Sequence, residues 1–263
     1  MSDLTLTDLA AAPAVDTALV GPAPARSRWG FWATTAWGVA VFATMLLVDL
    51  AATIAVLVSW GVDENSMPTA AELQSHATIV ATAALAHLPV CVAVLMLAVW
   101  LARVSVADYL ALKRFDAAHL LIGLACTFGY LAAVDIVTYL SGRSMSVHFV
   151  QEIYRTAVEG GTLPLLLLGV LVAAPVSEEL LFRGFLLRGW SASRLGAVGA
   201  VVLTSAIWAV IHTQYDWIIV GQIFGLGLLL GWLRLRSGST VLAIVLHGAY
   251  SAGALVQAAI LAG

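Results

Sequence analysis

The chain has few charged residues and few cysteines. Asp, Glu, Lys and Arg make up 10% of its 263 residues, whereas 62% are hydrophobic. A soluble domain has roughly 45–50% apolar and about 25% charged residues, so this chain lacks the charge that would cover a water-exposed surface. With 12 basic and 15 acidic residues it lacks the positive charge of a nucleic-acid-binding protein, and two cysteines in apolar runs imply no disulfide framework. The composition predicts an all-α, polytopic transmembrane helix bundle.

Apolar segments of sufficient length occur along most of the chain. A membrane-spanning helix needs about 20 mostly apolar residues, and about seven segments approach this: 30–60, 79–101, 119–140, 163–187, 197–213, 217–234 and 239–261. The two segments between 197 and 234 are short and closely joined. Residues 1–28, rich in Pro and Ala with scattered Asp, are expected to form a disordered cytoplasmic leader.

Basic residues gather on one side of the predicted bundle. If the seven spans alternate, nine Lys and Arg residues fall in the leader and in the loops after the second, fourth and sixth spans, and Arg143 and Arg155 fall on the other side. Cytoplasmic loops collect Lys and Arg. We therefore expect a cytoplasmic N-terminus, an external C-terminus and a bacterial inner-membrane location.

Ionisable side chains within the spans need a partner or a function, because placing them in lipid costs about 2.5–3.5 kcal/mol on insertion scales. Asp49, His87 and Asp135 stand alone in their spans. A hydrogen bond to a neighbouring helix would account for each of them, and for the two Asp residues the expected partner is a hydroxyl group. A proton relay in a carrier is the alternative.

The fourth span differs because it holds Glu178, Glu179 and Arg183 within six residues. Glu179 and Arg183 have the i,i+4 spacing of a helical ion pair. Adjacent residues point about 100° apart on a helix, so Glu178 is left on a separate face that can line a cavity. The structural alternative is a buried ion pair beside a protonated carboxyl group that only links helices.

Two later spans each carry one histidine: His212 ends the fifth, and His247 lies in the seventh with Ser251 one turn further on the same face. Glutamate and histidine can bind a metal, relay protons or activate water. The zinc-protease pattern H-E-x-x-H, the serine pattern G-x-S-G and an aspartyl-type G-D pair are all missing from the sequence. Among membrane peptidases, this leaves a glutamate-based one.

Two motifs point to a known family. Glu178, Glu179 and Arg183 form the pattern EExxxR, and Trp208 precedes His212 by four residues. These resemble the first two motifs of the CAAX protease and bacteriocin-processing family, the intramembrane glutamic endopeptidases, in which Phe is commoner at the aromatic position.

The third motif completes the resemblance with one departure. His247 is followed four residues later by Ser251, where the characterised prenyl-protein enzymes have asparagine. The resemblance covers roughly residues 105–255, including the stretch 107–113, which is similar to the loop entering the family domain. We divide the chain accordingly into a leader (1–28), N-terminal spans (29–104), a protease-like domain (105–255) and the end of the last span (256–263).

The resemblance implies a metal-independent peptide hydrolase with no cofactor. Glu178 would be the general base that takes a proton from the attacking water, assisted by His212. His247 would donate to the oxyanion of the tetrahedral intermediate. The supporting residues implied are Glu179, Arg183, Trp208 and Ser251. A zinc site built from the same residues is the rival.

Ser251 separates the possible functions. An asparagine amide reaches further than a serine hydroxyl and offers two N–H donors. The serine therefore favours the alternative of a non-proteolytic member that acts as a membrane-protein scaffold or confers bacteriocin immunity. A proton-coupled carrier is a third possibility.

The expected partners are the lipid bilayer and a peptide or membrane-protein substrate, and no nucleic acid. The sixth span carries glycines spaced four apart: Gly221 and Gly225, then Gly227 and Gly231. This spacing favours close helix packing inside the bundle over dimerisation. It does not determine the oligomeric state, and a monomer is one possibility.

Counting residues inward from the predicted cytoplasmic helix ends gives a depth for each candidate. Glu178 and His247 lie about 12–13 Å deep and His212 about 22 Å deep at 1.5 Å per residue. The counts predict a wet cavity that opens toward the cytoplasm, with His212 about 9 Å deeper than the other two.

Overall fold

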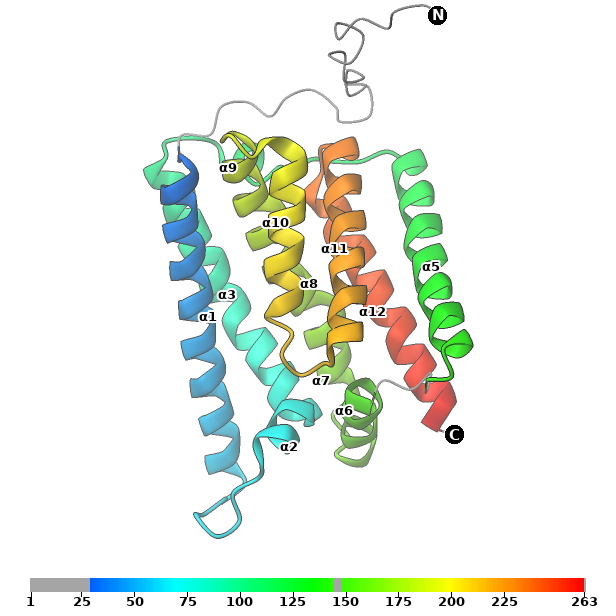
Figure 1. Ribbon diagram of the computed structural model, residues 1–263. Coiled ribbons are helices and arrows are strands. Elements are labelled where there is room, and N and C mark those ends of the chain that lie inside the picture. Colours follow the sequence, from blue (N-terminus) through cyan, green and yellow to red (C-terminus); the bar gives the residue numbers. More distant parts are fainter. Residues whose placement is uncertain (1–28, 144–147, 263) are drawn as a thin grey trace, which may run out of the picture.

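The computed structural model describes residues 29–143 and 148–262. Within these ranges every regular element is a helix, which confirms the all-α class; the predicted leader 1–28 lies outside the described residues. Long helices stand side by side in one bundle (Figure 1): α1 (Phe31–Ser59), α3 (Ala77–Leu101), α5 (Ala117–Leu140), α11 (Trp217–Ser237) and α12 (Thr240–Ala262).

The fourth predicted span is a continuous helical run that changes its winding twice. It consists of α7 (Leu163–Leu168), η2 (Gly169–Ala173), α8 (Ala174–Glu179), η3 (Leu180–Leu186) and α9 (Leu187–Ser191), of which η2 and η3 are π-helical. Pro175 has no N–H group that could donate to the carbonyl group four residues earlier. That carbonyl group lies in η2, the π-helical segment before Pro175. Glu178 and Glu179 thus lie between two π segments, which are frequent at functional sites.

Six described helical segments are long and apolar enough to cross a membrane, and α10 (Gly196–Val210) is a shorter apolar helix. All seven predicted segments are therefore helical, but α10 extends only about 22 Å, less than the ~30 Å hydrocarbon core. The loop after it turns back before the level of the lower ends of α1 and α12 (Figure 1). Non-helical backbone at such a depth is tolerated where it is buried or lines a cavity.

Three short helices were not predicted: α2 (Ala70–Ser75), α4 (Val106–Tyr109) and α6 (His148–Glu159). They are too short to appear as apolar spans. In α6, Ile153 and Ala157 are buried while Arg155 forms exposed ion pairs with Glu152 and Glu159. This amphipathic helix lies at the lower end of the bundle in Figure 1.

The glycines of α11 allow α10 to approach closely. A Cβ atom at Gly227 would lie 2.8 Å from the Cβ of Ser205, and one at Gly231 would lie 2.8 Å from a methyl carbon of Val201. The predicted packing within the bundle is confirmed at these two positions and at Gly225, where a Cβ would clash with the Tyr130 hydroxyl oxygen of α5, whereas nothing lies within 4 Å of a Cβ at Gly221.

Candidate active site

Glu179 is fully buried at the centre of the bundle, where two side chains contact its carboxylate within hydrogen-bond distance. Nη1 of Arg183 donates to its Oε1 at 2.8 Å, and Nδ1 of His247 lies 3.0 Å from the same oxygen. The Arg183 guanidinium also lies 4.4 Å from the centre of the Trp208 ring and donates to the carbonyl of Gly227 at 3.4 Å. The predicted Glu179–Arg183 ion pair is confirmed, and it joins the fourth span to α10, α11 and α12.

Glu178 is half-buried and lies on a different face of α8, as predicted. It lines a cavity of about 230 Å³ together with His212, His247 and Ser251. Nε1 of Trp208 donates to Oε2 of Glu178 at 2.5 Å. One carboxylate oxygen is thus held by the indole, and the other makes no hydrogen bond with a described residue.

Trp208 stands between the two histidines. Its ring centre is 5.3 Å from that of His212 and 5.2 Å from that of His247, with both pairs at 81°. The depth difference of about 9 Å that was counted for His212 therefore does not keep it from sharing an indole with His247. The count assumed that the helices start at one level, whereas the contacts bring both histidines to the same indole.

The tautomer of His212 follows from its partner. Nδ1 lies 2.7 Å from the backbone carbonyl oxygen of Trp208. A carbonyl oxygen only accepts, so Nδ1 carries a proton, and in the neutral imidazole Nε2 keeps a lone pair. His212 can therefore accept a proton from a water molecule in the cavity.

Tyr215 belongs to the cavity but was not predicted. Its ring stacks on His212 with centroids 6.2 Å apart and an interplanar angle of 18°. Burial, with smaller contributions from Tyr250 and Glu178, raises the pKa of the Tyr215 phenol, so its hydroxyl stays protonated at neutral pH. Its position three residues after His212 was the signal in the sequence that could have identified it. Phe149 also lines the cavity, but it comes from α6, which was not predicted.

Asp49 and His87 pair with each other instead of standing alone. Nδ1 of His87 lies 2.7 Å from Oδ1 of Asp49, and Nε2 lies 3.0 Å from the hydroxyl of Ser177. The predicted hydroxyl partner of Asp49 is thus replaced by an imidazole. The order Asp–His–Ser resembles a hydrolase triad, but Ser177 is fully buried and donates to the carbonyl of Ala173 at 2.9 Å. The three residues connect α8 to α1 and α3.

The donors of the rival zinc site do not gather as a ligand set. Within the described residues, no group of three or more His, Cys, Asp or Glu side chains has the spacing of a metal site. Glu178 accepts from Trp208, and Nδ1 of His247 is directed at Glu179.

The cavity lies toward the end of the bundle opposite to the start of α1. Its lining includes α6 and the loop after α10, both in the lower part of the bundle in Figure 1, whereas α1 begins at the upper end. A cytoplasmic N-terminus and a cavity open to the cytoplasm were both predicted, and this fold makes them incompatible. The depth count took the basic helix ends as the opening and did not consider the other end.

Residues 160–253 match the family model described as type II CAAX prenyl endopeptidase Rce1-like. The chain carries an Rce1-like segment. It contains all three motifs, from Glu178 to Ser251, and confirms the resemblance drawn from them. With its apolar helices, the chain is an integral membrane protein that carries a segment similar to CAAX prenyl endopeptidases.

The chain also has a similar curated relative. An uncharacterized 24.3 kDa protein from Escherichia coli is 27% identical over an alignment of 132 residues, and the match covers 48% of this chain. The chain spans 60% of the length of that relative. No solved structure matches.

Proposed function

We propose that the chain is an intramembrane glutamic endopeptidase that hydrolyses a peptide bond without a metal ion. The observation that carries this proposal is the different environment of two adjacent carboxylates. Arg183 neutralises Glu179 in the core, whereas Trp208 orients Glu178 in a cavity beside His212. The Rce1-like match supports the same class of reaction.

In the proposed reaction, water lies between the open carboxylate oxygen of Glu178 and Nε2 of His212. Glu178 takes a proton while the water oxygen bonds to the scissile carbonyl carbon. His247, protonated on both nitrogens, holds Glu179 through Nδ1 and donates from Nε2 to the oxyanion. The C–N bond then breaks, and Glu178 returns the proton to the leaving nitrogen.

We further propose the orientation that the basic residues favour, with a cytoplasmic N-terminus in a bacterial inner membrane. The cavity then faces the external side, and residues 105–255 form the peptidase domain. In intact cells, a membrane-impermeant maleimide is expected to label Gln214→Cys at the cavity and not Lys113→Cys at the opposite end. The reverse pattern contradicts this orientation.

A second candidate function rests on Ser251. Its side chain lines the cavity, yet its hydroxyl has no hydrogen-bond partner among the described residues. A member that lost the asparagine can act as a scaffold or an immunity protein without cleaving a peptide. In that case, a deletion strain complemented with Glu178→Gln keeps its wild-type phenotype.

The decisive experiment compares wild type, Glu178→Gln and the control Glu159→Gln, reconstituted in lipid vesicles with a peptide library. General-base catalysis contributes about 10²–10⁴-fold, so Glu178→Gln is expected to lose at least about 100-fold in cleavage without a change in melting temperature. Glu159→Gln removes an exposed carboxylate of α6 and is expected to cleave normally. Equal activity of wild type and Glu178→Gln overturns the peptidase. Activity lost with a chelator and restored by zinc overturns the metal-free reaction.

A further inference from the structure

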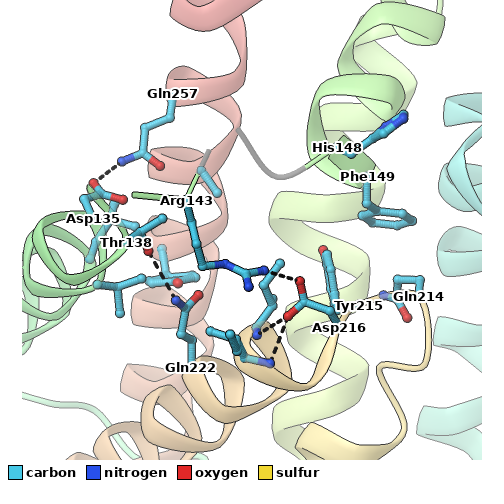
Figure 2. Close-up of a pocket in the computed structure, with 16 residues that line it drawn as sticks. Asp135, Thr138, Arg143, His148, Phe149, Gln214, Tyr215, Asp216, Gln222 and Gln257 are labelled. Atoms are coloured by element: carbon cyan, nitrogen blue, oxygen red, sulfur yellow. Dashed lines mark hydrogen bonds and ion pairs between the residues drawn. The ribbon is translucent and has the colours of Figure 1, made fainter. Parts of the chain in front are cut away.

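A second and larger cavity adjoins the one that holds Glu178. It measures about 410 Å³ and lies between α5, α6, α11 and α12. The two cavities share part of their lining, namely Phe149, Gln214, Tyr215, Tyr250 and Ala254. Figure 2 shows Phe149 and Tyr215 on one side of this second cavity and Asp135 with Gln257 on the other. A chain bound in the first cavity can therefore extend into the second.

The polar groups of the second cavity suit a polypeptide main chain. Gln257 donates to Asp135, and Gln222 makes a long contact of 3.5 Å with Thr138 (Figure 2). A side-chain amide donates and accepts, as a peptide group does. The hydroxyl of Tyr250 has no hydrogen-bond partner among the described residues and offers another contact.

The balance of charge favours a basic ligand. Nη2 of Arg143 donates to Asp216 at 2.7 Å, so this guanidinium already has a carboxylate partner. Hydrogen bonds from the backbone N–H groups of Ile219 and Ile218, together with Arg143, hold the pKa of Asp216 below its ordinary value. The remaining carboxylate is that of Asp135, whose described partner is the neutral amide of Gln257. An anionic headgroup here would meet two carboxylates, and the guanidinium of Arg143 is already paired.

We propose that this cavity is the subsite for a polar stretch of the peptide substrate and that Asp135 selects a Lys or Arg side chain in it. The proposal rests on the proposed function, in which the neighbouring cavity holds the scissile bond. The Asp in the third span thus serves specificity, because a partly buried carboxylate attracts a cation more strongly than a fully exposed one.

Binding is measured on the Glu178→Gln variant, so that no probe is consumed. The probes are fluorescent peptides in which one Lys is moved along an otherwise uncharged sequence, each with a Gln-matched partner. At one Lys position the Kd is expected to be at least about tenfold lower than for the Gln peptide. Adding Asp135→Asn is expected to bring the two within about twofold, because Asn keeps an acceptor for Gln257 but not the charge. Adding Glu159→Gln, which removes an exposed carboxylate of α6 outside both cavities, is expected to preserve the preference.

Three results would overturn the subsite. They are equal binding of the Lys and Gln peptides at every position, no binding of either peptide, and a preference that survives Asp135→Asn. Cleavage by the protein without substitutions tests the other proposal separately. If the Asp135-dependent preference is present and no peptide is cleaved, the proposed subsite is supported and the proposed peptidase activity is refuted. If peptides are cleaved without any such preference, the proposed peptidase activity is supported and the proposed subsite is refuted.

Discussion

Replacing Arg183 by Met tests whether the buried ion pair holds the bundle together. Arg183 and Glu179 are both fully buried, with Nη1 and Oε1 2.8 Å apart. Two unit charges about 4 Å apart attract by about 4 kcal/mol at an effective dielectric constant near 20. Removing one partner of a buried pair costs about 3–5 kcal/mol, because the other charge is left without compensation. We therefore expect Arg183→Met to lower the free energy of unfolding by about 3–5 kcal/mol.

The assay is reversible unfolding by SDS in mixed micelles, followed by tryptophan fluorescence. The matched control is Arg155→Met, since Arg155 is half-exposed and forms its ion pairs on the surface of α6. Exposed pairs contribute about 0–1 kcal/mol, so this variant is expected to lose at most about 1 kcal/mol.

A double variant separates the ion pair from the packing of the long side chain. Arg183→Met with Glu179→Gln removes both charges, and we expect it to recover at least about 2 kcal/mol relative to the sum of the two single losses. A loss below about 1 kcal/mol for Arg183→Met, or strict additivity of the two substitutions, refutes the assignment of a buried charge pair.

Two further predictions concern α12. A Cβ at Gly248 would lie 2.7 Å from the backbone oxygen of Leu171, so Gly248→Ala is expected to cost about 1–3 kcal/mol of stability and to lower cleavage by displacing the neighbouring His247. Gly221→Ala, at an open helical position, is expected to be neutral or up to about 1 kcal/mol stabilising; equal losses in the two variants on melting contradict the packing argument. Ser251→Asn supplies a longer donor and is expected to cleave peptides at an equal or higher rate, by up to about 100-fold, whereas a large loss in kcat shows that Ser251 has a different role.

Local properties of the sequence were sufficient for the helices and for one contact. The apolar segments were placed within a few residues, because membrane insertion depends on the length and hydrophobicity of each segment by itself. The Glu179–Arg183 pair follows from i,i+4 spacing on one helix. The same reasoning missed α6, because a short amphipathic helix has no apolar run of spanning length.

Contacts between helices were decided only by the tertiary structure. No pattern in the sequence indicates that His247 packs against Trp208, or that His87 is the partner of Asp49. Such contacts depend on the level, tilt and rotation of each helix, which its neighbours determine through packing. The end of the bundle near which the cavity lies depends on the same packing, since α10 ends partway along the bundle. The sequence by itself thus determined a helical membrane protein with a glutamate and two histidines in its spans, and the packing of those spans decided which of them meet and from which end they are reached.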